Sequence, residues 1–488
     1  MVIPRSENLK VKSMKLNFVF NIIKTLMTIL FPAISFPYAS RILGVEELGA
    51  VQYGTSIISY FSLFAALGIS VYAVREGAKV REDRKKLSKF SSEILIINLI
   101  TTTLVYGVLF LFIALNAFEG YVTLILVCSL LIPFTTLSIE WLYQITEDYA
   151  YISLRSIITQ LISLVLLFIF VKSKEDYIIY AFITVFSTSG YFLLNLAGAK
   201  RFVDFFKTNN YSLAKHIKPI LLVFGVSIAS SIYLNIDVVM LGAVFGDYEV
   251  GLYSVAMKIN VIVRNLIASV SIVVLPRLTT YLYHHKFKEN QQMLKSGIEL
   301  NLMLSIPAAV GIFMLSKQII IIVSGSAYVE ATFASQILAI NMVFSSLNNL
   351  LYYQVLIPFS LEKRASFGTI FGALMNIFLN FLWIYSFSYN GVAVATAVSE
   401  LLVFLIFLFM LKEKIDIKYL FKESYKVILG TLPIIPICYF GLSLNKSLPL
   451  TLILIVFASM MTYAGILYLL KANLVMEVSK DIRTFLKK

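Results

Sequence analysis

The chain has 488 residues, of which 59% are hydrophobic and 14% are charged. Because a soluble domain would carry about a quarter charged residues, this composition excludes a water-soluble globule and predicts a polytopic membrane protein whose solvent is lipid. The formal net charge of +14 would otherwise suggest a nucleic-acid partner, but most of the 41 Lys and Arg residues lie in alternate loops. That distribution is the positive-inside bias of membrane proteins, so no nucleic acid is expected.

The first apolar segment, residues 16–38, follows several lysines in the manner of a signal peptide. It is too long for one, so we expect an uncleaved first span. Similar segments recur along the chain, each near the length that a hydrocarbon core of about 30 Å requires, and they lack the ten-residue alternation of a membrane barrel. The sequence therefore predicts an all-α fold of about fourteen transmembrane helices, at residues 16–38, 50–74, 91–116, 121–144, 153–172, 177–199, 219–243, 251–276, 297–323, 331–358, 366–387, 391–411, 427–445 and 449–470.

Basic residues are densest in the loop at residues 75–89, directly after the second predicted span. The positive-inside rule places this loop in the cytoplasm. The later basic loops and the C-terminal tail fall on the same side, so both termini are expected in the cytoplasm, with the chain in a bacterial cytoplasmic membrane. The opposite loops are only a few residues long and leave no room for a catalytic domain.

Two segments of the chain are similar to each other, residues 43–49 and 245–251. Both contain two glycines five residues apart and a glutamate at the same offset, and both follow the first span of a half. The shared orientation predicts two six-helix bundles related by a parallel pseudo-repeat, the geometry of alternating-access transporters. The expected domains are an N-terminal lobe at 1–218, a C-terminal lobe at 219–426, and two additional helices with a tail at 427–488.

Four ionisable residues stand out inside the predicted spans: Lys24, Asp237, Lys258 and Arg264. Such groups are costly in hydrocarbon unless they meet a partner or water. The three cations come from different halves and are expected to converge on a central cavity, where they would bind a diphosphate. Alternatively, Lys24 reaches the inner interface and Arg264 pairs with Asp237. Asp237 is therefore a candidate either for a coupling-cation site or for that ion pair.

Amide side chains also lie within the spans. They suit sugar hydroxyls, but amides equally hold membrane helices together. The candidates for cargo or cavity contacts are Asn21, Asn235, Asn260, Asn349 and Asn376.

Several chemical functions have no sequence signature. No G-x-x-x-x-G-K-[ST] loop and no H-E-x-x-H motif occurs, and the two cysteines lack metal-ligand spacing. The three histidines, His216, His284 and His285, fall in predicted cytoplasmic loops, where we expect solvated side chains. The chain is therefore expected to be a transporter rather than an enzyme, and to need no cofactor or metal centre.

Several stretches together resemble the polysaccharide flippases of the Wzx type, in the multidrug, oligosaccharidyl-lipid and polysaccharide exporter superfamily. The resemblance covers nearly the whole chain and rests on loose motifs. These are Asn21-x-x-Lys24-Thr25, Arg41-Ile42-Leu43-Gly44 through Gly49, Asp237 through Leu241-Gly242, Val250-Gly251-Leu252-Tyr253-Ser254-x-x-x-Lys258, and Asn390-Gly391-Val392-Ala393-Val394-Ala395-Thr396.

The resemblance implies a two-lobed transporter that moves an undecaprenyl-diphosphate-linked oligosaccharide from the inner to the outer leaflet, for capsule, O-antigen or related polysaccharide assembly. It also implies that Lys24, Lys258 and Arg264 meet the diphosphate, and that an ion gradient drives transport. The expected partners are this lipid-linked oligosaccharide, membrane lipids and polysaccharide assembly proteins.

Three other functions compete with this interpretation. A flippase of the lipid-linked peptidoglycan precursor would carry the same diphosphate, so charge does not separate the two. A drug or cation antiporter would favour an acidic cavity, whereas the predicted spans are expected to hold three cations and one clear anion. A membrane glycan polymerase would need acidic outer loops or a soluble catalytic domain, and the sequence has neither.

Overall fold

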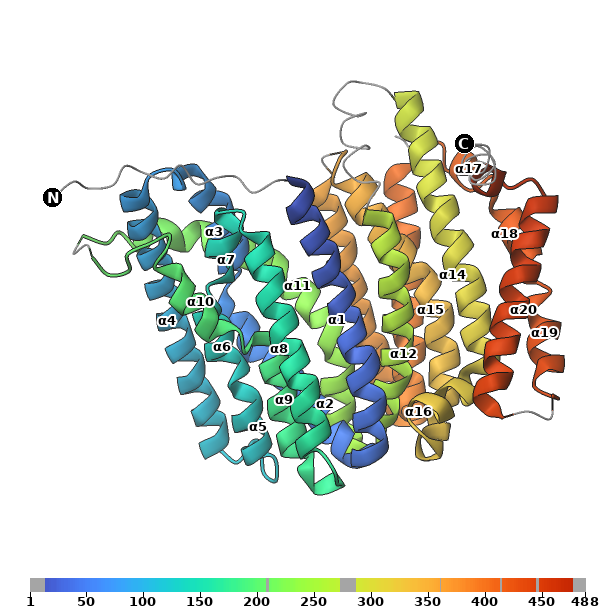
Figure 1. Cartoon of the computed structure of the whole chain (residues 1–488), viewed down its shortest axis with the longest axis horizontal. Helices are drawn as coiled ribbons and strands as arrows, with labels where there is room; N and C mark the ends of the chain where they lie inside the picture. The colour runs from blue at the N-terminus through green and yellow to red at the C-terminus, as the bar shows by residue number, and fades with distance from the viewer. Residues whose placement is uncertain are drawn as a thin grey trace. The chain divides into compact units, whose positions relative to one another are not determined.

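The computed structural model describes residues 14–207, 210–272, 287–359, 361–412, 415–444 and 447–476 (Figure 1). Within these ranges, the side chains of 14–22, 24–25, 226–234, 269–272 and 287–290 are not described. Clustering of neighbouring residues divides the chain into two compact units, Met1–Asn235 and Ile236–Lys488. The predicted boundary after residue 218 lies near the beginning of a helix that crosses from one unit into the other, and the three-part division stays a prediction.

Unit 1 is built from helices. They are α1 (Met14–Leu43), α2 (Val45–Ala66), α3 (Ile69–Gly77), η1 (Ala78–Val80), α4 (Arg84–Ala114), α5 (Val122–Ser129), α6 (Leu131–Ser138), α7 (Glu140–Ile145), α8 (Tyr149–Phe170), η2 (Lys174–Asp176), α9 (Tyr177–Ser189), α10 (Phe192–Ala199) and most of α11 (Ala214–Phe245). In unit 1, three predicted spans are discontinuous. The span at 50–74 breaks between α2 and α3, where Leu67 and Gly68 have positive φ. The span at 121–144 breaks into α5, α6 and α7, with Ile139 in a left-handed conformation at φ 39°, and the span at 177–199 breaks between α9 and α10.

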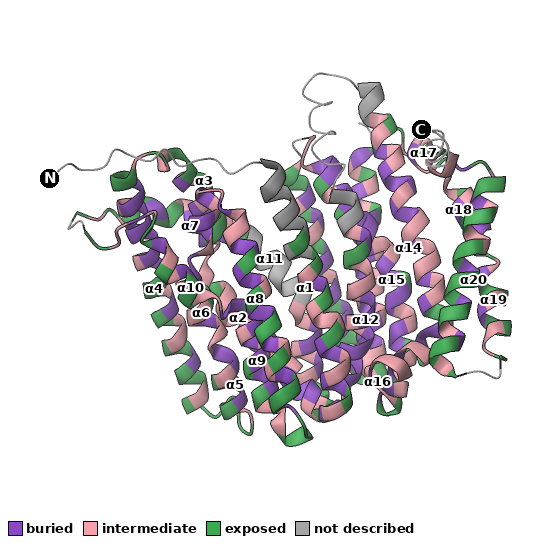
Figure 2. Cartoon of the chain, in the orientation of Figure 1, coloured by how far each residue is buried: buried purple, intermediate pink, exposed green. Residues whose placement is uncertain are grey.

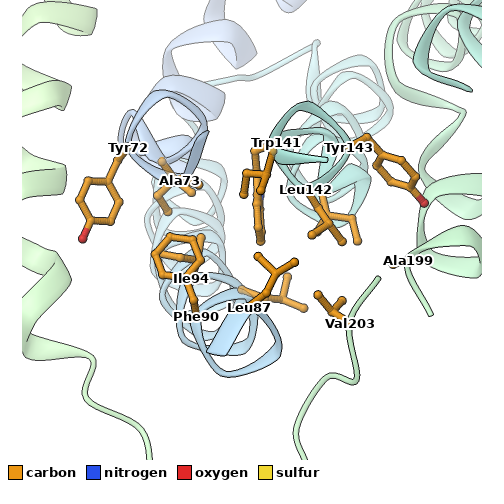
Figure 3. Close-up of a cluster of buried hydrophobic side chains, with 14 of the residues drawn as sticks. Tyr72, Ala73, Leu87, Phe90, Ile94, Trp141, Leu142, Tyr143, Ala199 and Val203 are labelled. Carbon is orange, nitrogen blue, oxygen red and sulfur yellow. The ribbon is translucent and has the colours of Figure 1, made fainter. Parts of the chain in front are cut away.

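Unit 1 contains a packed apolar core (Figure 3). Trp141 and Leu142 of α7 lie in one buried cluster with Ile94 of α4 and Ala73 of α3. The short helix α7 carries three large buried side chains in succession, so it is enclosed on several sides. This packing fixes the position of the chain directly after the break at Ile139.

Unit 2 contains the end of α11 and the remaining helices. They are α12 (Asp247–Ile272), α14 (Phe287–Val323), η3 (Ser326–Ala331), α15 (Thr332–Leu351), a short π-helical turn η4 (Tyr352–Leu356), α16 (Glu362–Leu411), α17 (Ile417–Leu420), α18 (Ser424–Thr431), α19 (Ile434–Gly441) and α20 (Leu448–Leu469). Within this unit α15 packs against α12, α14 and α16 (Figure 1).

Side chains are distributed as expected for a protein that faces lipid. Large apolar side chains on the outer surfaces of α4, α16 and α20 are exposed, including Phe381 at 66%, whereas the neighbouring Asn380 is fully buried (Figure 2). In water this arrangement would be strongly unfavourable, and in hydrocarbon it is the stable one. The described residues contain no strand, and the predicted all-helical polytopic membrane fold is confirmed.

Twelve helices of the described residues are long and apolar enough to cross a membrane. One of the twelve is α16, whose 50 residues would extend about 75 Å at 1.5 Å per residue, more than twice a bilayer core. Ser388 interrupts it with non-helical dihedrals of φ 49° and ψ −137°, and the predicted spans 366–387 and 391–411 flank this residue. The number fourteen stays a prediction.

Gly44 and Gly246, the first glycines of the two similar segments, adopt nearly the same φ, 87° and 91°. Gly44 directly precedes α2 and Gly246 directly precedes α12. Positive φ at these values is readily adopted only by glycine, which explains why both positions carry it. The pseudo-repeat as a whole stays a prediction.

Candidate functional site

A buried carboxylate with a complete set of donors lies within unit 2. Asp237, near the end of α11, is 7% exposed. Its Oδ1 accepts a hydrogen bond from Nδ2 of Asn380 at 2.7 Å. Its Oδ2 accepts from the Tyr253 hydroxyl at 2.7 Å and from the Thr396 hydroxyl at 2.6 Å. Helices α11, α12 and α16 therefore meet at this carboxylate.

The same cluster extends to a second amide on α16. Asn376 donates from Nδ2 to the Thr396 hydroxyl at 3.3 Å, and its Oδ1 accepts from Nδ2 of Asn380 at 3.3 Å. The spacing of four residues between Asn376 and Asn380 places both on one face of the helix. The buried Oδ1 of Asn380 has no hydrogen-bond partner among the described residues. Such an atom is costly unless something outside the described chain satisfies it.

The oxygen atoms of this cluster that could bind an ion determine which ions fit. Asp237, Asn376, Asn380 and Thr396 offer one carboxylate, two amide oxygens and a hydroxyl, the hard oxygen ligands that alkali and alkaline-earth cations prefer. A monovalent cation would neutralise the single carboxylate, whereas a divalent ion would leave a net buried charge. Among the described residues no cluster of three His, Cys, Asp or Glu side chains suits a transition metal. The arrangement fits a monovalent cation.

Arg264 of α12 lies elsewhere in unit 2 and is half-buried. Its Nη1 donates to the Ser345 hydroxyl on α15 at 2.9 Å. The alternative that Arg264 pairs with Asp237 is wrong, because the carboxylate is bonded to Tyr253, Thr396 and Asn380 and no ion pair joins the two in the described part of the chain. Asn260, one turn earlier on α12, donates to the carbonyl of Ser335 at 3.3 Å and is buried, so it connects two helices.

The other predicted site residues are placed as follows. Lys258 is half-buried on α12 and Asn235 is half-buried near the end of α11. Asn349 is exposed, while its neighbour Asn348 is buried. The side chains of Asn21 and Lys24 lie outside the described residues, although both positions belong to α1. Of the predicted set, the structure brings together Asp237 and Asn376.

Sequence reasoning missed several buried charges. Glu400 of α16 is 7% exposed, and its Oε2 accepts from Nδ2 of Asn348 at 2.5 Å. Arg155 of α8 is 2% exposed. The expected balance of three cations to one anion is therefore wrong for the described spans, and the charge argument against a cation antiporter loses that support. Both residues lie inside predicted spans, so hydropathy alone was enough to mark them.

Arg155 has unusual surroundings, formed by residues near the breaks at Ile139 and between α9 and α10. Its guanidinium carbon lies 4.8 Å from the ring centres of Tyr143 and Tyr191 and 5.5 Å from that of Tyr151. Its Nη2 lies 3.8 Å from Oε2 of Glu140, which also accepts from the Tyr191 hydroxyl at 2.8 Å. The three guanidinium nitrogens make no hydrogen bond among the described residues. Cation–π contacts and one carboxylate therefore stabilise this buried charge.

The expectation of a solvated His216 is wrong. This side chain is 3% exposed and lies at the beginning of α11. One ring nitrogen, Nε2, is 2.9 Å from Oε2 of Glu93, and the other, Nδ1, is 2.7 Å from the Tyr72 hydroxyl. Tyr72 and Phe90 also meet the ring edge-on. Hydropathy placed His216 in a loop, but hydropathy alone does not show whether neighbouring helices cover a loop residue. His284 and His285 lie outside the described residues.

Comparisons with known proteins agree on one family. A family model described as "Polysaccharide biosynthesis protein" matches residues 15–282, more than half of the 488 residues. A Shigella dysenteriae protein named "Putative O-antigen transporter" is 26% identical over 401 residues, covering 78% of this chain and 95% of that protein. A protein of the same name from Escherichia coli K12 is 25% identical over 386 residues, covering 77% and 91%.

A solved structure shares the fold. It is the Lipid II flippase MurJ in an inward closed conformation, which matches with a TM-score of 0.75 at 17% identity. The match covers 94% of this chain and 100% of the other. At this identity the similarity establishes the fold alone.

Proposed function

The chain belongs to the polysaccharide biosynthesis protein family, as the sequence resemblance predicted, and from this premise we propose that it is a flippase for a lipid-linked oligosaccharide. The proposed cargo is an undecaprenyl-diphosphate-linked repeat unit that moves from the inner to the outer leaflet for O-antigen, capsule or related polysaccharide assembly. The two O-antigen transporters, covered over more than nine-tenths of their length, support this cargo class. The protein would move its cargo without making or breaking a covalent bond.

The protein is a multi-pass membrane protein. We assign it to the bacterial cytoplasmic membrane with both termini in the cytoplasm, because the basic loops fall on that side. Membrane lipids surround its apolar outer surface, and polysaccharide assembly proteins that supply or accept the oligosaccharide are its proposed partners.

One observation carries the assignment of an anionic cargo. Arg264, inside a transmembrane helix, uses Nη1 to bond the Ser345 hydroxyl at 2.9 Å, and its other N–H groups make no hydrogen bond among the described residues. A guanidinium held at one corner presents its remaining donors in the planar array that phosphate oxygens accept. We propose that Arg264 binds the diphosphate, together with Lys258 and Lys24.

The cluster around Asp237 suits the coupling step. A monovalent cation bound by Asp237, Asn376, Asn380 and Thr396 would replace the hydrogen bonds that Asn380 and Thr396 donate to the carboxylate in this structure. It would also give the unpaired Oδ1 of Asn380 a partner. Because these residues come from α11 and α16, occupancy would alter how the two helices pack, which is the requirement for coupling an ion gradient to transport.

The test is complementation of a bacterial strain that lacks its own flippase. Surface glycan and the lipid-linked intermediate of the inner leaflet are measured for wild type, Arg264→Ala and Lys24→Ala at equal expression. Lys85→Ala is the matched control, because Lys85 is an exposed cation in the first turn of α4. We expect wild type and the control to restore glycan and the two cavity variants to accumulate intermediate. Normal function of both variants would refute the cation assignment, and failure of wild type with a matched cargo would refute the flippase function.

A further inference from the structure

Tyr253 differs from the other donors to Asp237 because its one other acceptor among the described residues, the Thr396 hydroxyl, is as far away as 3.5 Å. The Thr396 hydroxyl is 2.6 Å from the carboxylate and also 3.0 Å from the carbonyl of Val392. The Asn380 amide is 2.7 Å from the carboxylate and also 3.3 Å from Oδ1 of Asn376. Tyr253 is 1% exposed, and its hydroxyl partners among the described residues are Asp237 and, at 3.5 Å, the Thr396 hydroxyl.

These differences determine how the cluster responds to a cation. Thr396 can direct its proton to Val392 and present its oxygen to the ion. Asn380 can rotate its amide, which turns the unpaired Oδ1 toward the ion. Tyr253 could turn only to the Thr396 hydroxyl at 3.5 Å, and a hydrogen bond of that length compensates poorly for the lost one in a buried site. The hydrogen bond from Tyr253 to Oδ2 of Asp237 therefore persists when the other two rearrange.

We propose that Tyr253 sets the cation affinity of this site by keeping Oδ2 of Asp237 hydrogen-bonded, so that Oδ1 is the principal ligand atom. This inference rests on the proposed coupling function. A hydrogen bond to a carboxylate oxygen reduces the negative charge available to an ion, and a transport site must release its ion as well as bind it. Tyr253 is thus a positioning residue that acts through Asp237, and it keeps binding weak enough for release.

The experiment compares two variants that each remove one hydroxyl from the same carboxylate oxygen. Tyr253→Phe removes the proposed limiting donor, whereas Thr396→Val removes a donor that becomes a ligand. The purified full-length protein is titrated with Na⁺ at constant ionic strength, with choline chloride as the replacement salt, and the apparent affinity is obtained from protection against thermal unfolding. Tyr463→Phe is the folding control, because it removes another hydroxyl of unit 2, one that is partly buried and donates to the carbonyl of Met303 at 2.9 Å.

We expect Tyr253→Phe to bind Na⁺ roughly tenfold more tightly, the effect of one hydrogen bond to a charged group. Thr396→Val should bind it at least roughly tenfold more weakly, and Tyr463→Phe should match wild type. Equal weakening in Tyr253→Phe and Thr396→Val, or no change in Tyr253→Phe, would overturn the role of Tyr253 while leaving the cation site intact. If neither Na⁺ nor choline protects the wild type against thermal unfolding, the coupling site and the role of Tyr253 are both overturned.

Discussion

The carboxylate of Glu93 on α4 lies 2.9 Å from Nε2 of His216 at the beginning of α11. The same carboxylate accepts from the backbone N–H of Ser212 at 2.8 Å and from Nζ of Lys215 at 2.9 Å. Glu93 is 1% exposed. Glu93 therefore binds the segment before α11, and the first turn of α11, to α4, through the backbone amide of Ser212 and the side chains of Lys215 and His216.

The face of α4 preceding Glu93 binds the same segment. Ser88 and Ser92 accept hydrogen bonds from the backbone N–H groups of Asp204 and Phe206, at 2.9 and 3.0 Å. The serines are one helical turn apart, which aligns them with successive parts of the segment. Two parts of this segment, residues 204–206 and 212–216, are therefore bonded to α4.

We predict that Glu93→Gln loosens this connection. The amide keeps an acceptor for Ser212 but loses its charge toward Lys215 and His216, so about 2–3 kcal/mol of stability should be lost. Limited proteolysis should then cut the chain between residues 200 and 213 faster than in wild type. Glu76→Gln is the control, since Glu76 forms partly exposed ion pairs with Arg75 and Lys79. Equal protease resistance of the two variants would contradict the role of Glu93.

Asp204 gives this connection a pH dependence. A hydrogen bond from Lys207, followed by one from Arg84, lowers the pKa of Asp204. A lowered pKa in the folded protein means that ionised Asp204 stabilises the fold above the ordinary aspartate pKa, and that this contribution is lost as pH falls through the lowered value. Asp204→Asn should therefore melt below wild type at pH 7, and the difference in melting temperature should shrink as the pH falls below the ordinary aspartate pKa. If the difference in melting temperature between Asp204→Asn and wild type grew on acidification, ionised Asp204 would not stabilise the fold.

We predict a graded response at Arg155. Arg155→Ala leaves Glu140 without its buried cation and empties the space between three tyrosine rings, so a loss of about 3–5 kcal/mol is expected. Arg155→Lys keeps the charge but not the planar group that stacks on the rings, and should lie between alanine and wild type.

Arg201→Ala is the control for Arg155. Arg201 is exposed and lies 4.7 Å from the Tyr151 ring, so its loss should cost less than 1 kcal/mol. Thermal unfolding in detergent ranks the variants. Stability of Arg155→Lys equal to that of wild type would show that charge alone is required.

We predict that Gly44→Ala costs about 1–3 kcal/mol. Gly44 has φ 87° and ψ −176°, a region that residues with a Cβ avoid. The nearest atom to an added Cβ would be 3.5 Å away, so the cost arises from the backbone and not from a clash. Gly225→Ala is the control, because that helical glycine has nothing within 4 Å and alanine should be neutral or stabilising there. Equal melting temperatures of the two variants would refute the backbone argument.

The interior of the protein was only partly predictable. Asp237 is identifiable as an acid within an apolar run, and Asn376 with Asn380 as a pair on one helix face. The contact between these residues could not be predicted, because Asn380 and Thr396 lie 143 and 159 residues after Asp237 in the chain. The suggested pairing of Arg264 with Asp237 was wrong for the same reason, since two charges in apolar spans need partners but the sequence does not specify which.

Hydropathy and loop charge determined the class of this protein by themselves, because whether a segment prefers lipid to water depends on its own side chains. The sequence motifs were also sufficient for the family, which the family model confirms. Only the tertiary structure decided that His216 is buried on Glu93, that Arg155 lies among three tyrosines, and that Tyr253 and Thr396 share one oxygen of Asp237. Each of these depends on which face of one helix packs against another helix, and that is determined by the packing of many distant side chains together.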